Sequence, residues 1–287
     1  MHIYHTPILA EKILEFLDIK SNSILADLTT GEGGHSSLMV PLAPKGQLLC
    51  LDRDRIILEK AQERMKEYSN ITYICDTYDH LSTVREQINF PLFDGILIDM
   101  GISMFHFKGA ERGFSFEDDS LDMRLSEDHP ISAEQVINTF SEEDLADIFY
   151  YYGEERYSRR YAREIVKQRP FLSAKELADF LVNKIGRHGK IHPATKIFQA
   201  LRIYVNEELE IAENMLKEII DNLAIGGVLC ILTFHSLEDR LVKNAFKSYV
   251  KTGLGELLIP KTLSPSFEEI KSNPAARSAK LRVFKKG

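Results

Sequence analysis

Apolar runs alternate with amphipathic stretches along the first hundred residues of the chain. Near-continuous apolar runs are typical of strands buried on both faces, whereas apolar residues at helical spacing indicate amphipathic helices. The pattern predicts strands near 23–29, 46–52, 71–75 and 93–99 and helices near 36–43, 54–68 and 79–88, after a short helix that opens at Thr6-Pro7. This alternation predicts an α/β fold in which helices cover both faces of a mostly parallel sheet.

The pattern changes after residue 103, where a loop-like stretch is followed by helix signals without strands. Capping boxes at Ser132–Gln135 and Ser173–Glu176 indicate helix starts, and Gly153 and Gly186 indicate helix ends. A long helical stretch is expected from residue 193 to residue 223.

Strand signals return after Gly226-Gly227, with a strand at 228–234, a helix at 237–250 and a strand at 281–284. We therefore predict one α/β domain, residues 1–103 and 213–287, interrupted by an all-α insert at 104–212. We expect the α/β domain to bind a cofactor and the insert to recognise the substrate.

Composition is that of an ordinary globular protein, with 44% hydrophobic and 28% charged residues among 287. No apolar run approaches the roughly 18–20 residues that span a bilayer, and no signal peptide is visible. Cys50, Cys75 and Cys230 fall in predicted apolar strands, which indicates reduced structural thiols in a cytosolic protein. No Cys/His cluster has metal-ligand spacing, so we expect no metal and no membrane association.

The net charge of −7 argues mildly against a broad nucleic-acid surface, but basic residues cluster in two segments. Residues 271–287 hold six basic residues and no acid, and residues 156–169 hold six basic residues against one acid. Either segment could be a solvated face or a phosphate-binding surface.

A glycine-rich turn follows the first predicted strand, and an acid ends the next. Gly31, Gly33 and Gly34 allow close backbone approach, and Asp52 lies 21 positions after Gly31. This is the layout of a nucleoside-cofactor site, with an acid for the ribose hydroxyls. A pyrophosphate fingerprint would need a third glycine at position 36, which is serine. S-adenosylmethionine, which has no phosphates, therefore fits better than a dinucleotide.

Two further strand ends carry polar groups. Asp99 ends the fourth strand, where a carboxylate can accept a hydrogen bond from an exocyclic amine or cap the next turn. His235 and Ser236 follow the fifth strand, and Ser236 with Asp239 gives an N-cap signal for the next helix. A serine hydrolase is excluded, because sequence neighbours do not form a triad and no nucleophile elbow is present.

Several blocks together resemble the ribosomal small-subunit RNA methyltransferase H family, also called MraW. The clearest are Asp27-Leu-Thr-Thr-Gly-Glu-Gly-Gly-His35 and Phe234-His-Ser-Leu-Glu-Asp-Arg240. The others are residues 51–54, 94–101, 111–116, 121–124, 152–156, 193–203, 205–209 and 273–282. Their order matches across nearly the whole chain.

The resemblance implies a class I (Rossmann-like) methyltransferase that uses S-adenosylmethionine to form N4-methylcytidine in 16S rRNA, near the P site of the small ribosomal subunit. It implies that Gly33, Gly34, His35, Asp52 and Asp99 contact the cofactor. Tyr78 stands where the family usually has phenylalanine, so the resemblance implies that its ring still packs against the adenine of the cofactor. His106 replaces a glutamine associated with the cofactor, within a loop at 103–108 that departs from the family pattern.

Our hypothesis is that Asp99 orients the cytosine amine, with His235 or Ser236 beside it, and that basic residues grip RNA phosphates. The candidate RNA contacts are Arg156, Arg160, Arg202, Arg240, Arg277, Lys280 and Arg282. Arg202 lies on an amphipathic helix and could equally form an ion pair at the edge of the core.

Other functions remain open at this point: a nicotinamide-dependent dehydrogenase, a methyltransferase acting on another nucleic acid, or a binding module that has lost turnover. The missing third glycine and the helical insert count against the dehydrogenase. The altered 103–108 loop leaves the inactive module conceivable.

Overall fold

The structure, a computed structural model, describes residues 7–101, 111–126, 129–185 and 192–287. The chain divides into two compact units, one made of residues 1–101 and 209–287 and the other of residues 102–208. The expected features at Thr6, Gly186 and 103–108, His106 included, lie outside the described residues.

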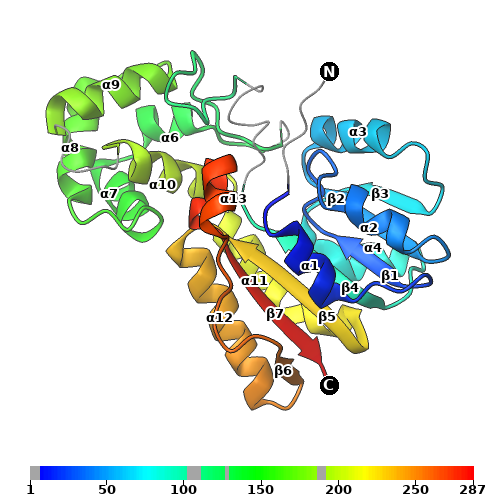
Figure 1. Cartoon of the computed structure of the whole chain (residues 1–287). Helices are drawn as coiled ribbons and strands as arrows, with labels where there is room; N and C mark the ends of the chain where they lie inside the picture. Colours follow the sequence, from blue (N-terminus) through cyan, green and yellow to red (C-terminus); the bar gives the residue numbers. More distant parts are fainter. Residues whose placement is uncertain (1–6, 102–110, 127–128, 186–191) are drawn as a thin grey trace. The chain divides into compact units, whose positions relative to one another are not determined.

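The first unit is built on a seven-stranded sheet (Figure 1) with the strand order β3-β2-β1-β4-β5-β7-β6. The strands are β1 (Ile24–Asp27), β2 (Gln47–Asp52), β3 (Ile71–Cys75), β4 (Phe93–Asp99), β5 (Leu223–Thr233), β6 (Gly255–Leu257) and β7 (Lys280–Lys286). Strands β1 to β5 pair in parallel, whereas β7 pairs antiparallel with β5 and β6. The predicted mostly parallel α/β sheet is confirmed.

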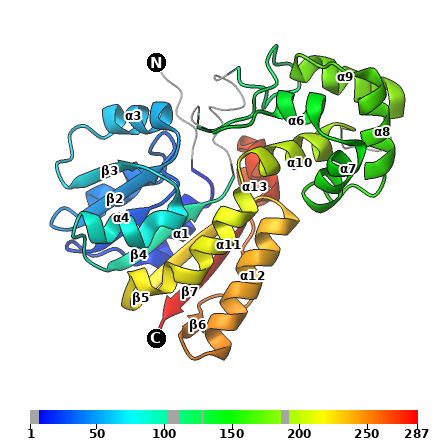
Figure 2. The same cartoon turned by 180° about the vertical axis from the view of Figure 1, so that it is seen from behind.

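Helices cover both faces of this sheet, as the near-continuous apolar strands require. One face carries α1 (Ala10–Leu17), α2 (Ser36–Met39) and α3 (Arg55–Arg64), whose buried side chains join one apolar cluster. The other face (Figure 2) carries α4 (Leu81–Gln87), α11 (Glu208–Glu218) and α12 (Ser236–Lys251), which bury a second cluster that includes Phe246. Four short 3₁₀ turns, η1 (Val40–Leu42), η2 (Tyr78–His80), η3 (Ile219–Asn222) and η4 (Pro274–Ser278), and α13 (Phe267–Ser272) complete the described part of the unit.

The second unit is helical where it is described, and it has its own apolar core. Its helices are α6 (Ala133–Thr139), α7 (Glu142–Tyr151), α8 (Ser158–Gln168), α9 (Ala174–Ile185) and α10 (Thr195–Val205). Fully buried side chains such as Phe149, Ile165 and Leu201 come from different helices and meet in one cluster. The capping box at Ser132 and Gln135 is present as predicted.

The long helix expected at 193–223 is wrong, because the chain breaks it near Asn206. The buried Asn206 side chain donates to the Met123 carbonyl oxygen at 2.7 Å and accepts from the Leu125 amide at 2.8 Å. Glu207 then has a left-handed backbone, with φ of 51°, so α10 ends and α11 starts anew. A side chain that bonds distant backbone gives the chain an alternative to continuing the helix.

Gly226-Gly227 lies within strand β5 and does not end a helix. The pairing runs from Phe93↔Leu223 to Gly95↔Val228, so β5 carries extra residues against its neighbour. Gly226 has φ of 79°, a conformation that glycine adopts readily. The expected strand at 228–234 therefore begins earlier, at Leu223.

The structure differs from the sequence prediction at three smaller points: β6, α13 and Cys75. The short strand β6 and the helix α13 carry too few residues for a periodic signal and were not predicted. Cys75 is exposed because β3 is an edge strand, whereas Cys50 and Cys230 are buried as expected.

Within the described residues, no helix combines the length and apolarity needed to cross a membrane.

At Gly46, just before β2, the backbone lies close to the backbone at Ser23, and a substitution at Gly46 tests this packing. A Cβ atom at Gly46 would lie 2.0 Å from the Ser23 carbonyl oxygen, so Gly46→Ala should cost about 1–3 kcal/mol in the free energy of unfolding. At Gly34 the nearest atom to such a Cβ is Pro7 Cγ at 3.3 Å, so Gly34→Ala is a matched control that should stay near wild type. Urea unfolding measures both, and equal stability of the two variants would contradict the packing described.

Candidate functional site

The predicted site residues of the α/β unit gather at the carboxyl edge of its parallel strands. Asp27, Asp52 and Asp99 end β1, β2 and β4, and the ladder places β1 between β2 and β4. His235 follows β5, the next strand along. Ligands bind at this edge in open α/β sheets because the strand order reverses there.

Two glycines of the first turn have backbone conformations that other residues rarely adopt. Gly31 has φ of 54° and Gly33 has φ of 76°. A Cβ at Gly33 would also lie 2.9 Å from Met65 Cε and 3.3 Å from Ala61 Cβ. The turn therefore needs glycine both for its conformation and for its packing on α3.

Asp52 holds this turn to the end of β2. Its two carboxylate oxygens accept hydrogen bonds from the Gly31 amide at 2.8 Å and from the Asp54 amide at 2.9 Å. Asp54 in turn caps α3 through its side chain. Asp52 keeps lone pairs on both oxygens, so it can still accept hydrogen bonds from ribose hydroxyls.

Asp27 is a buried acid whose carboxyl contacts residues on both sides of the glycine turn, Thr29 and Ser36. Its carboxyl accepts from the Ser36 hydroxyl at 2.5 Å and from the Thr29 amide at 3.3 Å. Burial raises the pKa of Asp27 to about 6, although the Ser36 hydrogen bond works against that rise. Ser36, the residue that breaks the pyrophosphate fingerprint, therefore has a structural partner.

His35 and Asp99 face each other at the end of the glycine turn. Their closest atoms, His35 Nε2 and Asp99 Oδ2, lie 3.7 Å apart, too far for a hydrogen bond. Among the described residues, neither His35 Nε2 nor Asp99 Oδ1 has a hydrogen-bond partner, although both atoms are buried. Buried polar atoms are nearly always satisfied, so this pair fits a site that a polar ligand completes.

Burial also holds this pair in neutral forms. It raises the pKa of the Asp99 carboxyl to about 8, and the charges of Asp27 and Glu238 add to that rise. It lowers the pKa of His35 to about 4. Near neutral pH the two residues are therefore not an ion pair, and no lysine or arginine among the described residues pairs with Asp99 to stabilise its ionised form.

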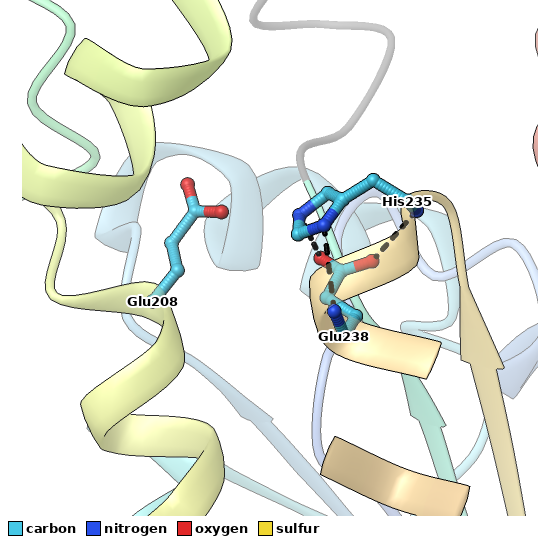
Figure 3. Close-up of side chains that lie close together, drawn as sticks. All are labelled: Glu208, His235 and Glu238. Atoms are coloured by element: carbon cyan, nitrogen blue, oxygen red, sulfur yellow. Dashed lines mark hydrogen bonds and ion pairs between the residues drawn. The ribbon is translucent and has the colours of Figure 1, made fainter. Parts of the chain in front are cut away.

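His235 begins α12 and takes part in its capping. Its Nδ1 atom accepts from the Glu238 amide at 3.4 Å, while the Glu238 carboxylate accepts from the Phe234 amide at 2.8 Å and the His235 amide at 3.3 Å. Figure 3 shows the His235 ring lying over the Glu238 carboxylate, with His235 Nε2 3.1 Å from Glu238 Oε1. The expected cap by Ser236 and Asp239 is wrong; Ser236 is the exposed first residue of α12.

Asp239 instead holds the last strand of the sheet. Its carboxylate accepts from Arg282 Nε at 2.8 Å and Lys280 Nζ at 3.3 Å, and these contacts lower the pKa of Asp239 despite its burial. The pairing favours a structural role for Arg282 and Lys280. Arg277 remains exposed, and Arg240 is exposed on α12.

The candidate RNA contacts in the helical unit also divide into two groups. Arg202 donates to both oxygens of Glu208, at 2.9 and 2.8 Å, and both side chains are largely buried. This favours the ion-pair role for Arg202. Arg156, just before α8, and Arg160, in the first turn of α8, are exposed and have no ion-pair partner among the described residues.

Tyr78 lies in η2, directly after β3, and packs against one apolar cluster of the sheet. It is therefore at the carboxyl edge where the sequence predicted the adenine to pack. Sequence reasoning missed the supporting contact between Ser36 and Asp27 and the supporting role of Glu238. The spacing of His235 and Glu238, three residues apart before an apolar helix, is the capping-box signal that could have found one of them.

The pH dependence of stability tests the burial of Asp99. Its pKa is about 8 in the folded protein against about 4 when unfolded, so between these values the folded state holds a proton that the unfolded state releases. Stability therefore falls as pH rises through this window. Asp99→Asn removes that loss, so its advantage over wild type in the free energy of unfolding should grow from pH 5 to pH 8.

Urea unfolding of ligand-free protein at several pH values measures this advantage. Asp221→Asn, which changes an exposed carboxyl of the same unit, is the control and should show no such trend. A constant difference between Asp99→Asn and wild type would contradict the burial described.

Comparison with known proteins agrees with this geometry. The family model described as the MraW methylase family matches residues 2–287. A protein of Coprothermobacter proteolyticus named ribosomal RNA small subunit methyltransferase H is 42% identical over all of this chain and 97% of its own length. A protein of Thermosipho africanus with the same name is 43% identical over 97% of this chain and 96% of its own.

Among solved structures, a protein of Clostridium thermocellum described as a candidate rRNA methylase matches with a TM-score of 0.50 at 10% identity, over the full length of both chains. That likeness concerns the fold, which is the α/β fold of class I methyltransferases. The full-length family match and the 42% identity show more: this chain belongs to the MraW methylase family.

Proposed function

We propose that this protein transfers a methyl group from S-adenosylmethionine to the N4 amine of a cytidine in the decoding region of 16S rRNA, near the P site. The observation that carries this proposal is a pair of buried atoms without hydrogen-bond partners among the described residues, His35 Nε2 and Asp99 Oδ1, at the end of a glycine turn. The family and the names of its full-length relatives support the reaction class and the small-subunit substrate.

The residues at the carboxyl edge fit the cofactor. The backbone at Gly31, Gly33 and Gly34 gives it an approach that side chains would block, and Asp52 accepts from its ribose hydroxyls. Tyr78 would pack against its adenine, and His35 and Asp99 would hold its charged end. The expected contribution of His106 stays a prediction.

When bound, the cofactor supplies a methyl group on a positively charged sulfur. A cation next to Asp99 favours the ionised carboxyl and lowers its pKa from about 8. Asp99 therefore becomes a carboxylate when the donor is in place. The same residue is then able to accept a hydrogen bond from the cytosine amine.

Asp99 has two roles in the transfer. Its carboxylate accepts an N4–H hydrogen bond and turns the nitrogen lone pair toward the methyl carbon. The cofactor held by these residues would supply the methyl group to the nitrogen and would keep the electron pair of the broken S–C bond on its sulfur. The nitrogen then loses one proton, which Asp99 takes up.

His235 is assigned a donor role by its own contacts. Its Nδ1 atom accepts the Glu238 amide hydrogen, so in the neutral ring Nε2 carries the proton. Nε2 has no hydrogen-bond partner among the described residues, so Nε2–H can donate to the acceptor base, while the Glu238 amide holds the ring through Nδ1. Ser236, exposed beside it, offers a hydroxyl at the same junction.

The helical unit offers a surface suited to RNA. Tyr150, Tyr151 and Tyr157 are each more than half exposed, close in sequence to Arg156 and Arg160. Exposed aromatic rings stack on unpaired bases, and arginine side chains bind phosphates. The proposed partner is the small ribosomal subunit, and the cytoplasm remains the predicted location.

Methyl transfer to small ribosomal subunits from a strain without the native enzyme tests the proposed function. With tritiated S-adenosylmethionine, wild type should label the RNA, and nucleoside analysis should find the label in N4-methylcytidine. Asp99→Asn should lose about a hundredfold or more in kcat because it cannot take up the proton. Label in another nucleoside, or no label despite cofactor binding, would contradict the proposal.

The salt dependence of RNA binding tests the surface on α8. Changing both Arg156 and Arg160 to alanine should weaken binding to small-subunit rRNA and lower its log–log salt slope by roughly 0.7 per lost phosphate contact. Arg163→Ala is the control, because Arg163 already pairs with Glu142 at 3.3 Å. An unchanged slope in the double variant would remove these residues from the RNA interface.

A further inference from the structure

A pocket opens beside the end of β5, at the same sheet edge as Asp99. Its volume is about 260 Å³. Its lining residues come from the β5–α12 junction and from the chain between β6 and β7: Phe234, His235, Ser236, Ser264, Arg277, Ser278, Ala279 and Lys280. None of these lining residues is acidic.

The charge of the pocket comes mainly from one residue. Lys280 Nζ lies 3.3 Å from the Asp239 carboxylate, which also pairs with Arg282, so much of its charge is compensated. Arg277 is exposed, and no ion pair to it occurs among the described residues. The pocket thus offers a guanidinium whose charge is uncompensated and whose planar donors suit a phosphate.

The backbone around Arg277 is held firmly. Arg277 and Ser278 lie in η4, between Ala276 and Ala279, which are both buried in an apolar cluster of the sheet. The next residue, Lys280, pairs with Thr233 in the β5–β7 ladder. A site on anchored backbone keeps its geometry better than one on a free tail.

The pocket lies near the residues that the proposed function assigns to the cytosine base. Leu232 of β5 pairs with Asp99, and the strand continues through Phe234 to His235, which lines the pocket. Hydroxyls of Ser264 and Ser278 line the same pocket and can donate to anionic oxygens. The pocket therefore includes His235, which the proposed function places beside the base, and it has the chemistry of a sugar–phosphate site.

We propose that this pocket binds a backbone phosphodiester of the RNA strand next to the nucleotide that is methylated, with Arg277 as the principal contact. The inference rests on the proposed function for the identity of the RNA. In this proposal Arg277 binds RNA, whereas Lys280 and Arg282 pair with Asp239 and hold strand β7 in place. The basic residues near the C-terminal end of the chain therefore have different roles.

Kinetics of methyl transfer to small ribosomal subunits test the pocket. With saturating cofactor, Arg277→Ala should raise KM about ten- to hundredfold, the loss expected for a hydrogen-bonded charged contact. It should also reduce the log–log salt slope of RNA binding by roughly 0.7, the value for one lost phosphate contact. Arg277→Lys should recover part of both effects. Affinity for S-adenosylhomocysteine and the thermal unfolding midpoint should stay at wild-type values.

Lys247→Ala is the matched control, because Lys247 is an exposed cation on α12 away from the pocket lining. It removes the same charge and should leave KM near wild type. Equal KM and equal salt slope for Arg277→Ala and Lys247→Ala would overturn the pocket assignment.

A second readout separates failure of the pocket from failure of the proposed function. If wild type transfers no methyl group, the proposed function falls, and anisotropy with a fluorescent hexacytidylate RNA still tests the pocket directly. Weaker binding by Arg277→Ala than by Lys247→Ala would support the phosphodiester site. Equal binding by the two variants would overturn it.

Discussion

The central constraint in this protein is the largely buried Asp99 carboxyl, which pairs with no lysine or arginine among the described residues. Asp99 ends β4, the charges of Asp27 and Glu238 add to the rise of its pKa, and the neutral ring of His35 faces it. The glycine turn, Asp52 and the capped α12 all position groups around this carboxyl. In the proposed function, a cationic ligand beside Asp99 stabilises the ionised carboxyl, and the sulfonium of the methyl donor is such a cation.

The apolar pattern was enough to predict the sheet, because strands buried on both faces need near-continuous apolar runs. Strands β3 and β4 begin and end at the predicted residues, whereas β5 begins five residues earlier than predicted. That miss, and the break at Asn206, have a common cause. Both depend on contacts between residues distant in sequence, the β4–β5 bulge and the Asn206 bonds to residues 123 and 125.

The candidate site was only partly accessible from the sequence. Strand ends and the glycine turn bring Asp52, His35 and Asp99 to one edge, and parallel topology makes this predictable. Which basic residues already have partners was not predictable, because Asp239 reaches Arg282 across 43 positions. Partner choice depends on the antiparallel return of β7, which the sequence pattern did not specify.

Titration of the Asp99 carboxyl is the most direct measurement of the central claim. In ligand-free protein labelled with ¹³C-aspartate, with the signal assigned through Asp99→Asn, the apparent pKa should be about 8. Saturation with S-adenosylmethionine should lower that pKa, since the bound cation favours the carboxylate. A ligand-free pKa near 4, or a raised pKa that the cofactor leaves unchanged, would contradict the role assigned to Asp99.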